Sequence, residues 1–259
     1  MEERFARMTR MVGEASMTAL ASARVTVVGM GAVGGYCVEA LARSGVGQFR
    51  LVDHDVVGLS NINRQLYALE STLGQKKVLL AAQRVCDINP ACEVEALDLF
   101  CTDETLEPIL GGEVDIVVDA IDSLVPKVTL LEGCLRREQA VFSSMGAALR
   151  TDPTKIRMGL LSQTEICPLA RVVRKFLRRR GVGCDIPCVY STEPMHELPD
   201  RAIAQLEESG DLVRGRRRRT MGSLPTLTGL FGLTLAHGVL NFLLDGCWDA
   251  RAHSEQKKS

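Results

Sequence analysis

A glycine-rich turn between a strand-like and a helix-like segment constrains this chain more than any other feature. Residues 24–28 (RVTVV) form a β-branched run, and GMGAVG at 29–34 follows it, ahead of an Ala- and Leu-rich segment. In such a G-x-G-x-x-G turn, the first glycine permits the turn, the second admits a phosphate, and the third lets the helix pack on the sheet. The N–H groups at the helix start also attract anions. We therefore predict that Gly29, Gly31 and Gly34 bind a nucleotide.

Strand-like and helix-like segments alternate up to residue 150. Apolar and β-branched runs predict strands at 24–28, 48–53, 92–97, 114–120 and 139–143. Helical periodicity predicts helices directly after the glycine turn and at 76–88, 103–110 and 123–137. This alternation predicts an α/β fold with a doubly wound, mostly parallel, Rossmann-like sheet.

The alternation weakens beyond Thr151, where we expect a C-terminal α/β extension. Its parts are a basic helix at 167–180, a strand at 186–192, a polar loop at about 196–220 and an apolar helix at 221–244. The length of the apolar helix is close to the ~20 residues that a helix needs to cross a bilayer. Its glycines and Pro225 favour instead a helix buried in the core or in a dimer interface. We expect one domain over 1–259, with a nucleotide-binding half at 1–150 and a substrate or dimer half at 151–259.

Charge and cysteine content bear on partners and location. The formal net charge is −1, so no global field attracts nucleic acid. Residues 1–10 are charged and precede no apolar signal region, so we expect the nine cysteines to be free thiols in a reducing cytoplasm. No C-x-x-C pair occurs, and Cys184 and Cys188 are interpreted as two thiols rather than half of a metal site.

Asp53 ends the second expected strand. A carboxylate at this place can accept hydrogen bonds from both ribose hydroxyls of a nucleotide. That role is common to NAD and ATP sites, so it does not distinguish them. The alternative is an aspartate that only caps a turn.

The segment after Asp53 distinguishes ATP from NAD. It carries polar residues that form no part of a dehydrogenase fingerprint, namely Asp55, Ser60, Asn61, Asn63, Arg64 and Gln65. Lys76 and Lys77 then begin a helix. Arginine and lysine at one nucleotide suit a triphosphate attacked at the α-phosphorus, because they neutralise the pentavalent centre and the leaving pyrophosphate. We predict catalytic roles for Arg64 and Lys77; the alternative is solvated surface cations.

The fourth expected strand leads into DAIDS at 119–123. Ligands bind at the carboxyl ends of parallel strands, and Mg²⁺ is usually held by one or two carboxylates together with phosphate oxygens. We predict that Asp122 holds Mg²⁺ and that Ser123 adjoins the nucleotide. The alternative is that Asp122 or Ser123 caps the helix that begins there.

In this order the motifs resemble the E1-like adenylating enzymes, which include the activators of sulfur-carrier proteins and of ubiquitin. The match covers nearly the whole chain, and INRQLYAL, INPACEV, DAIDSLVPK and VYSTEP look most like a branch that modifies adenosine in tRNA. The resemblance implies that ATP adenylates a threonylcarbamoyl carboxylate and that the carbamoyl nitrogen then closes a ring, releasing AMP. The alternative is adenylation of the C-terminal glycine of a ubiquitin-like sulfur carrier. The missing C-x-x-C pairs, and RTMG at 219–222 where some members carry a cysteine, argue against it.

The resemblance also implies roles for particular residues. Gly31, Gly34 and Asp53 would hold the adenosine side, Ser60, Asn61 and Arg64 the phosphates, Lys77 the α-phosphate and Asp122 the metal. A homodimer is implied, in which Arg7 or Arg10 reaches the partner's site. A sulfur-transfer partner and a monovalent cation are further implications, although SSMGAA at 143–148 has one glycine where the family often has several.

Two basic runs stand out against the near-neutral net charge. They are Arg171, Arg174, Lys175, Arg178, Arg179 and Arg180, and then Arg214 with Arg216 to Arg219. Clusters of this kind bind phosphate backbones, so we expect contact with tRNA. The alternative is a solvated basic helix and a polar loop.

Overall fold

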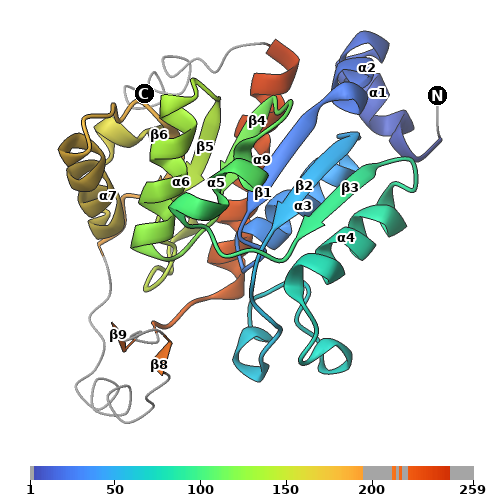
Figure 1. The fold of residues 1–259 in the computed structure, drawn as a ribbon. Helices are drawn as coiled ribbons and strands as arrows, with labels where there is room; N and C mark the ends of the chain where they lie inside the picture. The colour runs from blue at the N-terminus through green and yellow to red at the C-terminus, as the bar shows by residue number, and fades with distance from the viewer. Residues whose placement is uncertain (1–2, 195–211, 214–215, 218–220, 246–259) are drawn as a thin grey trace.

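A mostly parallel sheet forms the centre of the molecule (Figure 1). The computed structural model describes residues 3–194, 212–213, 216–217 and 221–245. The sheet has seven strands in the order β3-β2-β1-β4-β5-β7-β6. All neighbouring strands in it are parallel except the edge strand β6, which pairs antiparallel with β7. The strands are β1 (Arg24–Val28), β2 (Gln48–Val52), β3 (Glu93–Leu97), β4 (Ile116–Asp119), β5 (Val141–Ser144), β6 (Ile156–Leu160) and β7 (Pro187–Ser191). The strand order reverses between β1 and β4, which is where doubly wound sheets bind ligands.

Helices cover both faces of the sheet and bury a separate core on each (Figure 1). One face packs against α3 (Gly34–Arg43), α4 (Lys77–Ile88) and α9 (Pro225–Asp245). The other packs against α5 (Leu106–Leu110), α6 (Leu124–Arg136) and α7 (Pro168–Arg179). The short helices α1 (Ala6–Val12) and α2 (Glu14–Ser22) precede β1. The predicted fold class is confirmed.

Helix α9 is a core helix despite its composition. Among the described residues it is the one helix long and apolar enough to cross a membrane. Half of its most apolar 18-residue stretch is nevertheless buried in the protein. Its glycines allow close packing: a Cβ at Gly232 would lie 2.4 Å from the Val33 carbonyl oxygen, and one at Gly238 would lie 1.9 Å from Met158. The sequence predicted such packing for residues 221–244.

The sequence predictions missed three elements. Strand β6 is partly exposed and contains Gly159, which faces Tyr190, so it lacks the apolar alternation of a core strand. Helices α1 and α2 were not predicted because the N-terminal segment shows little amphipathic pattern. The polar loop predicted at 196–220 lies outside the described residues, apart from an antiparallel pair of two-residue strands, β8 (Leu212–Val213) and β9 (Arg216–Arg217).

Candidate functional site

The carboxyl ends of β1, β2 and β4 bring the predicted site residues together. The glycine loop after β1 contacts the end of β2, where the Met30 N–H donates to Asp53 Oδ2 at 2.6 Å. The same loop approaches the residues after β4, because a Cβ at Gly29 would lie 2.7 Å from the Ala120 carbonyl oxygen. One edge of the sheet therefore carries the glycine loop, Asp53 and the segment that holds Asp122.

The three loop glycines meet different surroundings. Gly29 has a φ of +99°, which favours glycine. A Cβ at Gly34 would lie 1.8 Å from the Gly29 carbonyl oxygen, so the start of α3 is packed against the loop. At Gly31 the nearest neighbour of a Cβ would be Gln65 Nε2 at 3.9 Å. The space beside Gly31 is open, as phosphate approach requires.

These surroundings predict opposite effects for two substitutions. Gly34→Ala should lower the melting temperature of the protein, because the new methyl group collides with backbone. Gly31→Ala should leave the melting temperature within a few degrees but weaken ATP binding about tenfold or more, since loss of a charged hydrogen bond costs roughly 1.5–3 kcal/mol. Thermal melts and ATP titration by calorimetry measure both. Unchanged ATP affinity in Gly31→Ala would contradict a phosphate at this glycine.

Asp53 is buried at the end of β2 and already accepts two backbone hydrogen bonds. Besides Met30, the Asp55 N–H donates to its Oδ1 at 2.7 Å. Burial raises the pKa of Asp53, while these two N–H donors and the charge of Lys77 oppose the rise. The carboxylate thus fixes the glycine loop, as the turn-capping alternative expects, and the second lone pair of each oxygen is what it can offer to ribose hydroxyls.

The two neighbouring lysines at the start of α4 have different environments. Lys77 is buried, and its Nζ lies 3.0 Å from Asp55 Oδ2. Lys76 points to the surface, where its Nζ lies 2.9 Å from Asp98 Oδ2. The structure therefore brings Lys77, and not Lys76, into the same group as Asp53 and Asp55.

The polar segment after β2 folds into a tight loop held by its own side chains. Asn61 Oδ1 accepts the Gly58 N–H at 3.0 Å. Arg64 Nη1 donates to the carbonyl of Ser60 at 3.0 Å and to Asn63 Oδ1 at 2.8 Å. The loop packs on the start of α3 through Tyr67, whose hydroxyl donates to the Gly35 carbonyl at 3.3 Å. Asn61 and Asn63 thus shape the loop that carries Arg64, and Gln65, the next residue, lies beside Gly31 of the glycine turn.

Asp119 is the last residue of β4 and Asp122 follows it, and the two carboxylates differ sharply in burial. Asp122 is exposed, and its Oδ1 accepts a hydrogen bond from the Ser123 hydroxyl at 3.1 Å. Ser123 occupies the N-cap position of α6, as the capping alternative predicted. Its side chain makes no capping hydrogen bond to the helix, however. Asp119 is fully buried, and its Oδ2 lies 2.5 Å from Lys127 Nζ.

The Asp119–Lys127 pair was missed by the sequence interpretation. Ser143 Oγ donates to Asp119 Oδ2 at 2.6 Å, and Lys127 Nζ donates to the Ser144 carbonyl at 2.9 Å. Asp119 Oδ1 also accepts the Ile121 N–H at 3.1 Å. The pair therefore joins β4, α6 and β5 beneath the loop that carries Asp122. A lysine in the largely apolar first half of α6 was the signal that could have revealed it.

Arg7 and Arg10 lie far from this edge within one chain. They are exposed on α1, which with α2 sits at the amino ends of the strands (Figure 1). There the Gly47 N–H, just before β2, donates to the Leu20 carbonyl. Either arginine can therefore serve a nucleotide site only in another copy of the chain.

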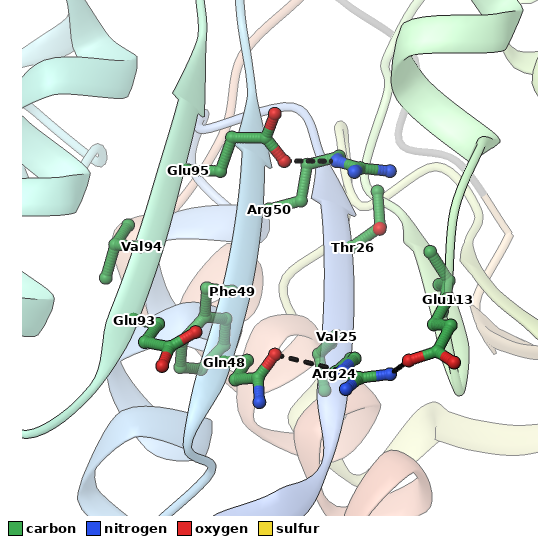
Figure 2. A pocket seen from close by; sticks show the side chains of 11 residues that line it. Arg24, Val25, Thr26, Gln48, Phe49, Arg50, Glu93, Val94, Glu95 and Glu113 are labelled. Carbon is green, nitrogen blue, oxygen red and sulfur yellow. Dashed lines mark hydrogen bonds and ion pairs between the residues drawn. The ribbon is translucent and has the colours of Figure 1, made fainter.

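A hollow of about 290 Å³ on the face of β1, β2 and β3 is not part of the site (Figure 2). Four of its charged side chains form two ion pairs: Arg50 Nε lies 2.6 Å from Glu95 Oε2, and Arg24 pairs with Glu113. None of the predicted site residues lines it. The predicted site residues therefore lie at the edge of the sheet, outside this hollow.

Clusters of potential metal ligands are few in the part of the chain that the structure describes. The one group of three is Asp53, His54 and Asp55, of which Asp55 is paired with Lys77. Cys184 and Cys188 are both buried and join no such group. Burial raises the pKa of the Cys188 thiol well above its usual value, as expected for an inert core cysteine.

The sheet order and the glycine loop at its carboxyl edge are those of a doubly wound, nucleotide-binding class of protein. The model of the ThiF family matches residues 4–257. The chain belongs to the ThiF family, which confirms the resemblance drawn from its sequence.

Known relatives match over nearly the full length. The chain is 39% identical over 249 residues to the tRNA threonylcarbamoyladenosine dehydratase of Bacillus subtilis, covering 95% of this chain and 96% of that protein. The crystal structure of Escherichia coli tRNA N6-threonylcarbamoyladenosine dehydratase in complex with ATP is similar with a TM-score of 0.82 at 29% identity, covering 99% of this chain and 97% of the other. A molybdopterin-synthase adenylyltransferase of Salmonella typhimurium is 34% identical but covers only 52% of this chain.

Proposed function

We propose that this chain is an ATP-dependent tRNA-modifying enzyme that adenylates the threonylcarbamoyl carboxylate of a modified adenosine and closes it into a ring. The observation that carries the proposal is the convergence of the glycine loop, Lys77 and the Arg64 loop on one edge of the sheet. The near full-length similarity to dehydratases of this name supports it.

The proposed reaction has two steps. A carboxylate oxygen of the substrate attacks the α-phosphorus of ATP, and pyrophosphate leaves with the electron pair of the broken bond. The carbamoyl nitrogen then attacks the acyl carbon, loses its proton, and AMP leaves with the former carboxylate oxygen. The substrate is lighter by one water overall. No protein nucleophile is required, because the attacking nitrogen belongs to the substrate.

The cations of the edge would serve the first step. Lys77, which is paired with Asp55, would donate hydrogen bonds to the α-phosphate oxygens. Arg64 would bind the outer phosphates, and Ser60 and Asn61 would fix the loop that carries it. Such groups stabilise the charge that develops in phosphoryl transfer. Gly29, Gly31 and Gly34 would hold the phosphates still, and Asp53 the ribose.

We also propose a magnesium ion at Asp122. The exposed carboxylate at the end of β4 fits an ion whose remaining ligands are phosphate oxygens and water, and the ion would supply charge neutralisation at the leaving pyrophosphate. The monovalent cation implied at 143–148 has less support. There Ser143 and the Ser144 carbonyl already serve the buried pair.

We further propose that the chain is a cytoplasmic homodimer. Large apolar side chains stay exposed at and before α9, including Leu224, Leu230 and Leu233, and exposed apolar patches mark association surfaces. A dimer would also give Arg7 or Arg10 a partner site to reach. Light scattering on the purified protein should give twice the mass of one chain.

Release of AMP tests the proposed function against the alternative. The purified protein is incubated with ATP and either threonylcarbamoylated tRNA or a sulfur-carrier protein ending in Gly-Gly. We expect AMP only with the modified tRNA, and none with tRNA that lacks the threonylcarbamoyl group. AMP release triggered by the carrier protein alone would replace the proposal with sulfur-carrier activation.

A further inference from the structure

Helix α7 carries a row of cations along one side, and none of them forms an ion pair with another described residue. Arg171, Lys175 and Arg178 follow one another at i, i+4 and i+7, which places them on one face of a helix. Arg179 adjoins this face, and all four residues are exposed. We call these four residues the α7 stripe. Helix α7 contains no acidic residue.

The remaining arginines of the basic run have structural partners instead. Arg174 Nη1 donates to the carbonyls of Leu161 at 3.0 Å and Thr164 at 2.9 Å. Arg180 Nη1 lies 2.5 Å from Glu132 Oε2 on α6. The opposite face of α7, with Ala170, Val173 and Leu177, is buried. The structure thus separates the run into side chains that anchor the helix and side chains that face outward.

The direction of α7 connects the stripe to the nucleotide edge. Its first turn lies beside the residues after β5, since a Cβ at Gly146 would lie 3.8 Å from Leu169 Cβ. Its far end lies beside the end of α6, where Arg136 Nη2 donates to the Arg180 carbonyl at 3.0 Å. Arg171 and Arg179 are eight residues apart on α7, so at 1.5 Å per residue the stripe is about 12 Å long. It therefore runs from the catalytic edge along the outside of the protein (Figure 1).

A hollow of about 220 Å³ lies at the edge end of the stripe, and Arg171 lines it together with Arg174. Glu165 also lines it, so the hollow itself is of mixed charge. The stripe beyond it is wholly cationic and has no aromatic side chain on its exposed face. This chemistry fits a row of phosphates better than it fits bases, which bind by stacking.

We propose that the α7 stripe binds the phosphate backbone of the substrate RNA and leads its modified adenosine to the nucleotide edge. The inference rests on the proposed function for the identity of the RNA. It adds the surface and the orientation: the helix of the RNA lies along α7, with the reacting nucleotide at the Arg171 end.

The test uses a double substitution and a matched control. Lys175→Gln/Arg178→Gln removes two charges from the stripe. Arg43→Gln/Arg84→Gln removes two exposed charges from α3 and α4, on the other face of the sheet. Both variants and the wild type are compared for affinity to threonylcarbamoylated tRNA over a series of salt concentrations, and for affinity to ATP.

The stripe variant should bind the tRNA about 10- to 50-fold more weakly near 0.1 M salt, with a salt slope smaller by about 1.5, because each lost phosphate contact removes about 0.7–0.9 from the slope. Its KM for tRNA should rise while kcat at saturating tRNA and ATP affinity stay near wild type. The control variant should match the wild type in every measurement.

The outcomes separate this inference from the proposed function. If the wild type neither binds nor alters the modified tRNA, the proposed function fails. If the wild type does both and the stripe variant keeps its affinity and salt slope, the stripe does not carry the RNA and the inference alone is overturned. An equal loss in the control variant would also overturn it, since the effect would then be one of net charge.

Discussion

Lys77→Ala should lower the rate of AMP formation at least about a hundredfold, as removal of one preorganised charge-stabilising group does in other enzymes. Lys77 is the buried cation at the edge, 3.0 Å from Asp55 Oδ2. Its charge acts on Asp53, the carboxylate that holds the glycine loop, so we expect Lys77 to stabilise the charge that develops on the α-phosphate during attack. No other lysine among the described residues adjoins Asp53 and Asp55 from within the protein.

The adjacent Lys76 supplies the control. Lys76→Ala removes the same side chain one residue earlier, but its Nζ pairs with Asp98 at the surface. We expect AMP formation near the wild-type rate in this variant and a small change in stability. AMP is measured chromatographically at saturating ATP and modified tRNA, with circular dichroism to verify folding. Similar rates for the folded Lys77→Ala variant and the wild type would remove Lys77 from the mechanism.

Lys127→Met should lower the free energy of unfolding by about 3–5 kcal/mol, because it leaves the buried Asp119 carboxylate without its cation. Both partners are fully buried, and Asp119 further fixes Ser143 and the Ile121 N–H. The loop that carries Asp122 therefore depends on this pair for its position. Loss of Lys127 should also weaken catalysis, since the Asp122 carboxylate, which we propose holds magnesium, would be less well placed.

A second substitution distinguishes lost pairing from lost packing. Asp119→Asn/Lys127→Met also removes the buried negative charge that the single variant leaves unpaired. We therefore expect the double variant to be more stable than Lys127→Met. Urea unfolding at neutral pH measures both free energies. A double variant less stable than the single one would show that the buried charge of Asp119 is not the cause.

The fold was largely predictable because its strands and helices carry strong local patterns. β1 is a β-branched run after Arg24, β4 is apolar up to its last residue, Asp119, and Asn89-Pro90 ends α4 where the sequence predicted. Strand β6 escaped prediction because an edge strand next to β7 is defined by pairing with Tyr190 and its neighbours, not by its own pattern. Local propensity contains little information about such long-range pairing.

The sequence indicated which segments meet at the candidate site, but not how their side chains contact one another. Sequence order predicted that the segments of Asp53, Arg64, Lys77 and Asp122 meet at one edge, because parallel strands share their carboxyl edge; their binding to one nucleotide stays a prediction. It could not show that Asp55 holds Lys77, or that Asp119 pairs with Lys127 across two elements. It also treated the basic run as one surface, whereas Arg174 and Arg180 are internal anchors.

Mass analysis of nucleosides tests the central claim most directly. Threonylcarbamoylated tRNA is incubated with the protein and ATP, digested under mild conditions and compared with a reaction that lacks ATP. The account predicts a modified adenosine lighter by one water, in an amount that matches the AMP formed. Unchanged nucleoside mass in the presence of ATP and active, folded protein would contradict it.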